Sequence, residues 1–251
     1  MASLTEAMAG TVLSLGRVDI MGDTHATPDE FAWLDVGYIA MKLVGFLLAP
    51  WLIGRLRARF AMVGATLVMG LACLIASATV PLDMLIALRC LQGVSGGVLL
   101  IAGQTLLFLA FPLHRQPLLQ ALFAMGSVVV PATLAPALQG WLLDTHAWTW
   151  IFFGVVPVAL AAAGILLLAG TPDIAVDDRS KPFDWIGFVL MGIAFFCLTY
   201  VFIQGNRWEW FQELRIAWVA VIGAAALLVF LGRQVQMRGR GLIDFSVFAH
   251  Q

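Results

Sequence analysis

The stretch "MLIALRCLQGVSGGVLLIAGQ", residues 84–104, places one arginine and two glutamines in a run that is otherwise apolar or small. A buried, unpaired arginine is costly inside a membrane, so Arg89 is expected to have a partner or a function. Composition indicates that the run does lie in a membrane: 61% of the 251 residues are hydrophobic and only 12% are charged. Soluble domains have about 45–50% apolar and about 25% charged residues. The sequence therefore predicts a polytopic membrane protein.

Seven apolar segments come close to the roughly 20 residues that a helix needs to cross the hydrocarbon core of a membrane. They cover residues 31–53, 61–81, 84–110, 118–142, 148–170, 183–203 and 214–232. Before them, the uncharged stretch between Glu6 and Arg17 has only ten residues, which cannot cross a bilayer alone. Because this stretch also lacks the features of a signal peptide, we expect it to be the second half of a helix whose first half is missing.

The connections on one side of these segments hold most of the positive charge. That side carries nine Lys or Arg residues: Arg55, Arg57, Arg59, Arg115, Arg179, Lys181, Arg233, Arg238 and Arg240. The other side carries only Arg17, Arg207 and Arg215. Since cytoplasmic loops are rich in Lys and Arg, the first side and both termini are predicted to be cytoplasmic, in a multi-pass protein of the cell (inner) membrane. Five tryptophans at the predicted outer ends indicate an interfacial aromatic belt: Trp33, Trp148, Trp150, Trp208 and Trp210.

Other classes of function find little support in the residues. A net charge of −1 argues against a nucleic-acid partner, which would normally require a basic patch. The cysteines Cys73, Cys90 and Cys197 all fall in apolar runs without ligand spacing, so neither a disulfide framework nor a metal site is predicted. The four histidines are spread through loops and the tail, with no metal-ligand spacing and no triad, so an enzyme is not predicted.

The polar and small residues of the segment 84–110 share one helical face. Arg89, Gln92, Gly93, Gly96 and Gly97 recur at the spacing i, i+3, i+4, i+7 and i+8, which joins a fixed positive charge to a glycine groove. Such glycines favour the close approach of a neighbouring helix. Because Arg89 shares its face with Gln92, we expect it in a polar cavity; the alternative is a residue that snorkels to the outer rim.

The segment 118–142 holds Pro131 and Pro136, five residues apart. Each proline removes a backbone donor and clashes with the preceding turn, so this helix is expected to bend or open locally. In a membrane such a break is tolerated only where neighbouring groups or water satisfy the backbone. The segment is therefore expected inside a bundle, at a moving or substrate-lining interface.

Taken in order, these segments resemble the fourteen-helix drug:proton antiporters of the major facilitator superfamily. "RCLQGVSGG" resembles the motif of the family's fourth helix, with key positions at Arg89, Gln92 and Gly93. "SVVVPATLAPALQGWLLD" resembles the antiporter motif of the fifth helix, with matches at Pro131, Pro136 and Gly140. The stretches "TPDEFAWLDVGY", "FPLHRQPLLQA", "WTWIFFGVVP", "FDWIGFVL" and "GLIDFSVF" extend the resemblance along almost the whole chain.

Some positions depart from the family pattern. The basic turn "GRLRARFA", which contains Gly54 and Arg59, has Ala58 where the family usually has an acid that helps to hold the inner gate. The family's first helix usually carries an aspartate where Thr5 stands, and Glu6 follows one position and roughly 100° further around the helix. This pattern suggests a divergent member of the family.

The resemblance implies an all-α fold, a transmembrane helix bundle that is the N-terminal half of a major facilitator fold plus two linker helices. Residues 1–172 would form a six-helix bundle with an incomplete first helix, 173–182 a cytoplasmic linker, 183–232 two linker helices, and 233–251 a tail that leads to a missing C-terminal bundle. It also implies proton-coupled efflux of small amphipathic compounds, with this chain as a fragment cut at both ends. The alternative is a non-transporting membrane scaffold or interaction protein built from half of the fold.

For an antiporter, the resemblance implies a proton gradient and no other cofactor, and as partners a lipid bilayer, a small-molecule substrate and a second polypeptide that could supply the C-terminal bundle. Our hypothesis is that Glu6 is the coupling acid and Arg89 the fixed cation that biases its proton. Asp35 is a third candidate, or else a solvated acid at the outer rim; Lys42, on the same face, is too far from Asp35 to pair with it. The candidate pathway or gating residues are Gln92, Gly93, Gly97, Gln104, Pro131, Pro136, Gly140, Gly54 and Arg59.

Overall fold

The computed structural model describes residues 2–168 and 183–237, and every regular element in these ranges is helical. In chain order the elements are α1 (Ala2–Thr24), α2 (Pro28–Leu56), α3 (Ala58–Ser77), α4 (Leu82–Ala110), η1 (Leu113–Arg115), α5 (Gln116–Ala124), η2 (Met125–Val129), α6 (Val130–Thr145), α7 (Thr149–Phe153), α8 (Val155–Leu168), α9 (Trp185–Gln204), η3 (Trp210–Gln212) and α10 (Leu214–Met237). The predicted all-α class is confirmed. The predicted linker at 173–182 and the tail after residue 237 lie outside the described residues.

Within the described residues, six helices are long and apolar enough to cross a membrane: α2, α3, α4, α7 with α8, α9 and α10. The seventh predicted segment, 118–142, is divided into α5, the π-helical turn η2 and α6. Pro131 lies in the first turn of α6, and the carbonyl that its missing N–H would have bonded belongs to Ser127, inside the π-helical turn. The predicted local opening is therefore present beside Pro131, whereas Pro136 lies inside the continuous helix α6.

The first helix is longer than the apolar stretch from which it was predicted. α1 has 23 residues, about 34 Å at 1.5 Å per residue, and continues past Arg17 to Thr24. The helix can contain these charges because Arg17 and Asp19 are exposed, so neither loses its contact with solvent. α1 is polar enough that it does not join the six apolar spans.

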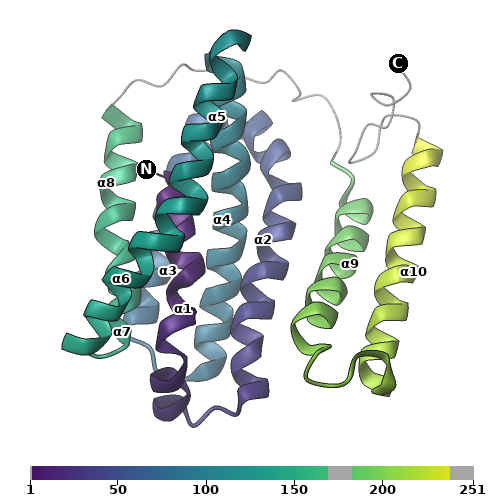
Figure 1. The fold of residues 1–251 in the computed structure, drawn as a ribbon. Helices are drawn as coiled ribbons and strands as arrows, with labels where there is room; N and C mark the ends of the chain where they lie inside the picture. Colours follow the sequence, from purple (N-terminus) through teal and green to yellow (C-terminus); the bar gives the residue numbers. More distant parts are fainter. Residues whose placement is uncertain (1, 169–182, 238–251) are drawn as a thin grey trace.

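Figure 1 shows α1 to α8 gathered in one bundle, with α9 and α10 forming a hairpin at its side, next to α2. The closest helix contact in the bundle is between α2 and α4. A Cβ on Gly93 would collide with the carbonyl oxygen of Tyr38, and one on Gly97 with the carbonyl oxygen of Lys42. The glycines of α4 therefore let the two backbones touch, as their spacing predicted.

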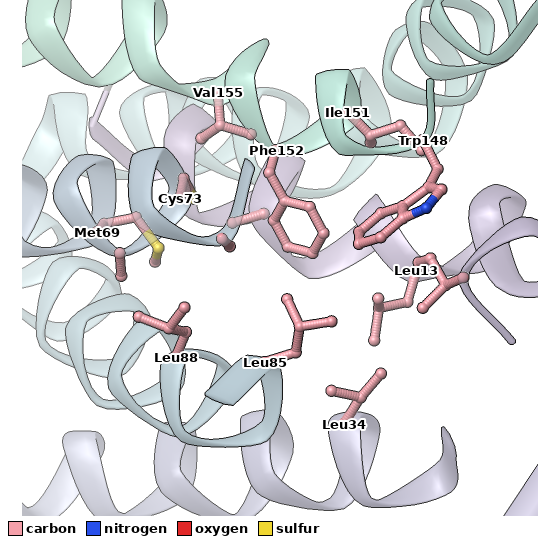
Figure 2. Close-up of a cluster of buried hydrophobic side chains, with 14 of the residues drawn as sticks. Leu13, Leu34, Met69, Cys73, Leu85, Leu88, Trp148, Ile151, Phe152 and Val155 are labelled. Carbon is pink, nitrogen blue, oxygen red and sulfur yellow. The ribbon is translucent and has the colours of Figure 1, made fainter. Parts of the chain in front are cut away.

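The main hydrophobic core lies between α1, α2, α3, α4, α7 and α8, and Figure 2 shows part of it. Phe152 and Trp148 enter this core beside Leu13 and Leu85. Trp148 is only 4% exposed, and its indole N–H donates a hydrogen bond of 2.6 Å to the carboxylate of Asp23 at the end of α1. The interpretation of Trp148 as part of an interfacial belt is therefore wrong, because the ring packs inside the bundle.

Aromatic contacts hold the α9–α10 hairpin against α2 near both ends of that helix. Near its start, Trp33 packs on Tyr200 with ring centroids 5.3 Å apart. Near its end, Trp51 packs on Trp185 at 5.9 Å. Arg207, in the turn between α9 and α10, adds an ion pair of 2.8 Å to Asp29 in the first turn of α2. The tryptophans of α2 thus fix the hairpin as well as lying near the predicted membrane surfaces.

The two helices of the hairpin are joined to each other by a buried carboxylate. Asp184, the N-cap of α9, accepts a hydrogen bond of 3.0 Å from the backbone N–H of Gly187 and forms an ion pair of 3.0 Å with Arg233 of α10. Burial of the carboxyl opposes ionisation, but the hydrogen bonds from Arg233 and Gly187 outweigh it, so the pKa of Asp184 lies below its usual value. The charge-assisted contact closes the open end of the hairpin.

Candidate functional site

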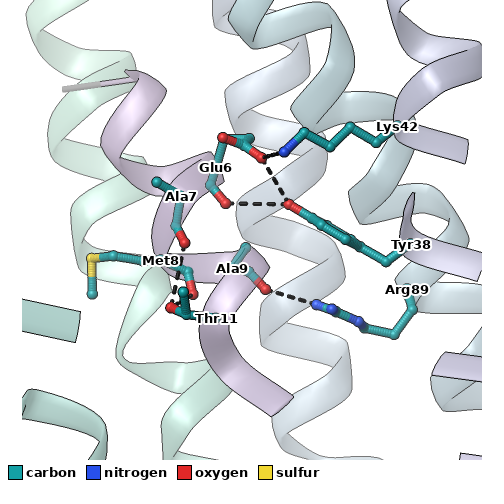
Figure 3. Close-up of polar contacts among 8 residues, drawn as sticks. All are labelled: Glu6, Ala7, Met8, Ala9, Thr11, Tyr38, Lys42 and Arg89. Carbon is teal, nitrogen blue, oxygen red and sulfur yellow. Dashed lines mark hydrogen bonds and ion pairs between the residues drawn. The ribbon is translucent and has the colours of Figure 1, made fainter. Parts of the chain in front are cut away.

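The carboxylate of Glu6 lies at the centre of a buried polar cluster formed by α1, α2 and α4, shown in Figure 3. Glu6 is only 2% exposed, and its Oε1 is ion-paired with Nζ of Lys42. The hydroxyl of Tyr38 donates a hydrogen bond of 3.0 Å to the same oxygen and a longer one of 3.3 Å to the Glu6 carbonyl. A buried carboxylate is stable only when it is paired and hydrogen-bonded, and Glu6 has both kinds of partner.

Glycines make the room that this cluster needs. A Cβ on Gly96 of α4 would lie 2.8 Å from Cγ of Glu6 and 3.5 Å from the hydroxyl of Tyr38. A Cβ on Gly10 of α1 would lie 3.2 Å from the same hydroxyl. The glycine face of α4 therefore packs against the α2 backbone through Gly93 and Gly97, and leaves space for the side chains of the cluster at Gly96.

Arg89 forms the second part of the cluster. Its Nη1 donates hydrogen bonds to the carbonyl oxygen of Ala9 at 2.7 Å and to Oε1 of Gln92 at 3.1 Å. Its guanidinium carbon lies 4.2 Å from the centroid of the Tyr38 ring. Because Arg89 is 1% exposed and reaches into the bundle, the alternative that it snorkels to the outer rim is wrong. The side chain fixes α1, α2 and α4 relative to one another.

Several donors of this cluster have no partner in the described part of the chain. Nε and Nη2 of Arg89 and Nε2 of Gln92 are buried and make no hydrogen bond to any of the described residues. Proteins satisfy almost all buried donors, with water or a ligand where no protein group is at hand. These three atoms are thus the groups of the cluster that are available to bind water or a polar substrate.

The predicted coupling residues are only partly brought together. Glu6 and Arg89 belong to one cluster, but no ion pair joins them among the described residues; the ammonium of Lys42 occupies that position instead. Asp35 is half-buried and forms no ion pair within the described part of the chain, although it is close enough to Arg89 and Arg17 to interact electrostatically. The charges therefore form a group of four, Glu6, Asp35, Lys42 and Arg89, whose formal sum is zero.

Three residues of the structure's polar contacts were not predicted as site residues: Tyr38, Lys42 and Gln139. Tyr38 and Lys42 are four residues apart on one helical face, and Lys42 is the one lysine inside a predicted span, which was a usable signal. Gln139 stands at a position where the fifth-helix motif of the resembling family usually has a glycine. It is buried on α6 and donates hydrogen bonds to Oγ1 of Thr11 at 3.3 Å and to the Met8 carbonyl oxygen at 3.4 Å, which ties α6 to α1.

Gln104 lies apart from the charged cluster, in the wall of a half-open cavity of about 540 Å³. The cavity is bounded by α2, α4, α5 and η2, and its wall is formed by Phe46, Leu100, Ile101, Gln104, Leu107, Phe108, Gln120, Phe123, Ala124, Ser127 and Val128. Most of this wall is apolar, with two glutamines and a serine. Phe46 follows Lys42 by one turn on the same face of α2, so the cavity begins next to the charged cluster.

The other predicted pathway residues lie elsewhere in the bundle. Arg59, at the start of α3, donates a hydrogen bond to the carbonyl oxygen of Leu167 in the last turn of α8, where a cation also complements the helix dipole. Gly54 is buried near the end of α2, and a Cβ there would meet no atom within 4 Å. Pro136 and Gly140 are half-buried on α6. These residues do not reach the cluster around Glu6.

The cluster thus brings two carboxylates and two cations close together inside the bundle, Glu6 and Asp35 with Lys42 and Arg89. Within residues 2–168 and 183–237, no group of three His, Cys, Asp or Glu side chains is placed to hold a metal ion.

A sequence model of the Major Facilitator Superfamily matches residues 1–243. Among curated relatives, the multidrug export protein EmrB of Haemophilus influenzae is 25% identical over 249 residues, which are 99% of this chain and 48% of that protein. The protein of the same name in Escherichia coli is 23% identical over 248 residues, again 99% of this chain and 48% of the relative. The tetracenomycin C resistance and export protein of Streptomyces glaucescens is 30% identical over 233 residues, 90% of this chain and 41% of that protein.

The chain thus spans about half the length of the curated relatives that it matches. The six apolar helices of spanning length in residues 2–168 and 183–237 agree with a multi-pass membrane protein. Because the family model covers almost the whole chain, and because the helical bundle carries the polar face on which the resemblance was based, this protein belongs to the Major Facilitator Superfamily.

Proposed function

We propose that this chain forms the N-terminal, proton-coupling part of an efflux antiporter for small amphipathic compounds. The observation that carries the proposal is the buried carboxylate of Glu6, held by Lys42 and Tyr38 and placed beside Arg89. Buried ionisable groups within a membrane bundle commonly form proton and substrate pathways. Relatives named for multidrug export and for tetracenomycin C resistance and export support efflux rather than catalysis.

In the proposed mechanism, two helix bundles rock around a site near the middle of the membrane, which faces each side in turn. Proton uptake neutralises Glu6 on one side, and proton release restores its charge on the other. Substrate binds in the state in which Glu6 is ionised, so that the proton and the substrate alternate. Arg89 remains charged throughout, because arginine does not deprotonate in proteins.

The cavity next to the cluster is a suitable place for the substrate. Its wall contains Phe46, Phe108 and Phe123, which can cover an apolar ring system, together with the amides of Gln104 and Gln120. Small-molecule sites are commonly apolar with a few placed polar groups. A compound with an apolar body in this cavity could extend its polar end along α2 toward Lys42.

The C-terminal bundle of such an antiporter would come from a second polypeptide or from further residues of a longer protein. We place the turn between α2 and α3, which holds Arg57, on the cytoplasmic side. The intact mass of the polypeptide isolated from its native membrane tests where the C-terminal bundle comes from. A mass near the 27.2 kDa of this chain, with no co-purifying partner, would contradict the antiporter proposal and favour a membrane scaffold.

The transport proposal is tested by exchange in liposomes that contain the protein as isolated from its native membrane, with ethidium as the probe. We expect added ethidium to exchange for protons across the membrane of liposomes that hold the unsubstituted protein, and not of those that hold Glu6→Gln. Arg89→Ala should reduce the rate of this exchange by at least tenfold. Glu213→Gln, at an exposed acid just before α10, is the matched control and should exchange normally. Unchanged exchange in both Glu6→Gln and Arg89→Ala would overturn the assignment of these residues.

A further inference from the structure

The two cations of the buried cluster are held in different ways. Arg89 donates hydrogen bonds to Ala9 and Gln92 and lies against the Tyr38 ring, so three neighbours fix it. Among the described residues, Lys42 makes one ion pair, with Glu6, and its ammonium lies 5.7 Å from the centroid of the Tyr38 ring, farther than the guanidinium of Arg89. The side chain of Lys42 is 25% exposed, whereas that of Glu6 is 3% exposed. One cation is therefore built into the bundle, and the other has open space beside it.

We propose that Lys42 is the mobile counter-ion of Glu6, which holds the carboxylate while no proton is bound and leaves it when a proton binds. This inference rests on the proposed function, since it concerns the same proton site. It adds Lys42 as a positioning residue, which competes with the proton for the Glu6 carboxylate. The proton bonds to a carboxylate oxygen of Glu6, the ion pair breaks, and Lys42 keeps its own proton as a free ammonium.

The backbone of Lys42 cannot be the part that moves. A Cβ on Gly97 would collide with the Lys42 carbonyl oxygen, and one on Gly93 would lie 3.1 Å from the Lys42 nitrogen. The helix of Lys42 is thus packed directly against α4 at this residue. Only the four-carbon side chain can change position, and its rotatable bonds give it the reach to turn toward the exposed side.

The proton and the ammonium of Lys42 compete for the Glu6 carboxylate because the site has low polarity. Removal of one partner from a buried ion pair leaves an uncompensated charge, at a cost of several kcal/mol, unless the remaining group changes its protonation state. The titratable or charged groups around Glu6 are Tyr38, Lys42 and Asp35 of α2, Arg89 of α4 and Cys73 of α3. Among the described residues, Lys42 is the cation in direct contact with the carboxylate.

The released ammonium also has a consequence for the substrate. With Glu6 ionised, the ion pair is neutral and the adjacent cavity carries no added charge. With Glu6 protonated, Lys42 adds one positive charge near Phe46, at the edge of that cavity. Binding of a proton and binding of a cationic compound then oppose each other. Antiport requires this opposition, because the two must bind in turn.

The test follows the protonation of Glu6 directly, by infrared titration of the carboxylic acid C=O band of the purified 251-residue chain in lipid nanodiscs. The variant Glu6→Gln identifies the band, because the band of Glu6 is absent from it. We expect the band to appear at a pH at least one unit higher in Lys42→Met than in the unsubstituted chain, since loss of an adjacent opposite charge favours protonation. Lys42→Arg, which keeps the charge, should restore a midpoint close to that of the unsubstituted chain.

Arg17→Met is the matched control, because it removes an exposed positive charge from α1 itself and should leave the midpoint unchanged. Lys42→Gln replaces Lys42→Met if the latter does not fold. An unshifted midpoint in the neutral variants, or no Glu6 band in them at any pH, would overturn the role of Lys42. Titration requires no transport, so a shifted band without ethidium exchange would contradict the proposed function alone.

Discussion

The hydroxyl of Tyr38 on α2 donates a hydrogen bond of 3.0 Å to the carboxylate of Glu6 on α1. The face of the same ring lies against the guanidinium of Arg89. Tyr38 therefore stands between the acid and the fixed cation, and this position explains why Arg89 bonds the backbone of α1 rather than the carboxylate. Its hydroxyl orients the acid, and its ring orients the cation.

Tyr38→Phe should keep the ring and lose the hydrogen bond to Glu6. We expect the free energy of unfolding to fall by about 1 kcal/mol, because a hydrogen bond to a charged group is lost in a buried site. Thermal unfolding of the purified chain in detergent measures the change. Tyr200→Phe, which removes the hydroxyl of the other tyrosine of the chain, on α9, is the control. Equal effects of the two substitutions would contradict a specific role for the Tyr38 hydroxyl.

Arg89→Lys should not preserve the site, although it preserves the charge. A lysine ammonium could donate to Ala9 and Gln92, but lysine has no planar guanidinium that lies on the Tyr38 ring at the same time. We expect about 2 kcal/mol of lost stability and at least tenfold slower ethidium exchange. Arg115→Lys, at an exposed arginine of η1, should change neither quantity. Normal exchange by Arg89→Lys would show that charge alone is sufficient.

Gly97→Ala should push α2 and α4 apart. Its Cβ would collide with the Lys42 carbonyl and lie 2.9 Å from the Cα of Gly45, and both obstacles are backbone atoms that cannot rotate away. Overpacking of this kind costs about 1–3 kcal/mol. Gly64→Ala on α3 is the matched control, because a Cβ there meets no atom within 4 Å, and it should be neutral or slightly stabilising. Thermal unfolding of the two variants side by side decides the point.

The contact between Asp184 and Arg233 should make stability depend on pH. The pKa of Asp184 is lower in the folded protein than in the unfolded chain, so its contribution is present above about pH 4 and is lost as the pH falls through the folded pKa. Asp184→Asn keeps an N-cap acceptor and removes the charge. The difference in melting temperature between the unsubstituted chain and Asp184→Asn should therefore shrink as the pH falls below about 4. Asp144→Asn, at an exposed acid near the end of α6, is the control.

Arg57 joins α2 to α3 with φ 67° and ψ 146°, a backbone conformation that is costly for residues with a Cβ. Arg57→Gly should therefore raise the free energy of unfolding by about 1 kcal/mol relative to Arg57→Ala. Arg57→Ala removes the same side chain and keeps the Cβ, so the comparison isolates the backbone. Equal melting temperatures for the two variants would contradict the presence of strain at this turn.

Features that depend on residues close together in the chain were predicted well. Six of the seven predicted apolar segments are spanning helices in the described part of the chain, because length and hydropathy are local properties. The spacing of Arg89, Gln92 and Gly93 gave the buried face of α4, since a helix fixes the directions of residues three or four positions apart. Pro131 predicted the interruption before α6 for the same reason, whereas Pro136 lies inside the continuous helix.

The partners across helices were decided by the tertiary structure. Glu6 and Tyr38 are 32 positions apart, and only the packing of α1 on the glycine face of α4 brings the acid to Tyr38 and Lys42. Trp148 looked like a surface anchor from its place near a helix end, but the fold turns its ring inward to Asp23. The sequence by itself thus determined a helical membrane bundle with a buried arginine on one face. Which cation holds the acid was set by the tertiary structure, because the reach of a side chain across a helix interface depends on how closely the backbones pack.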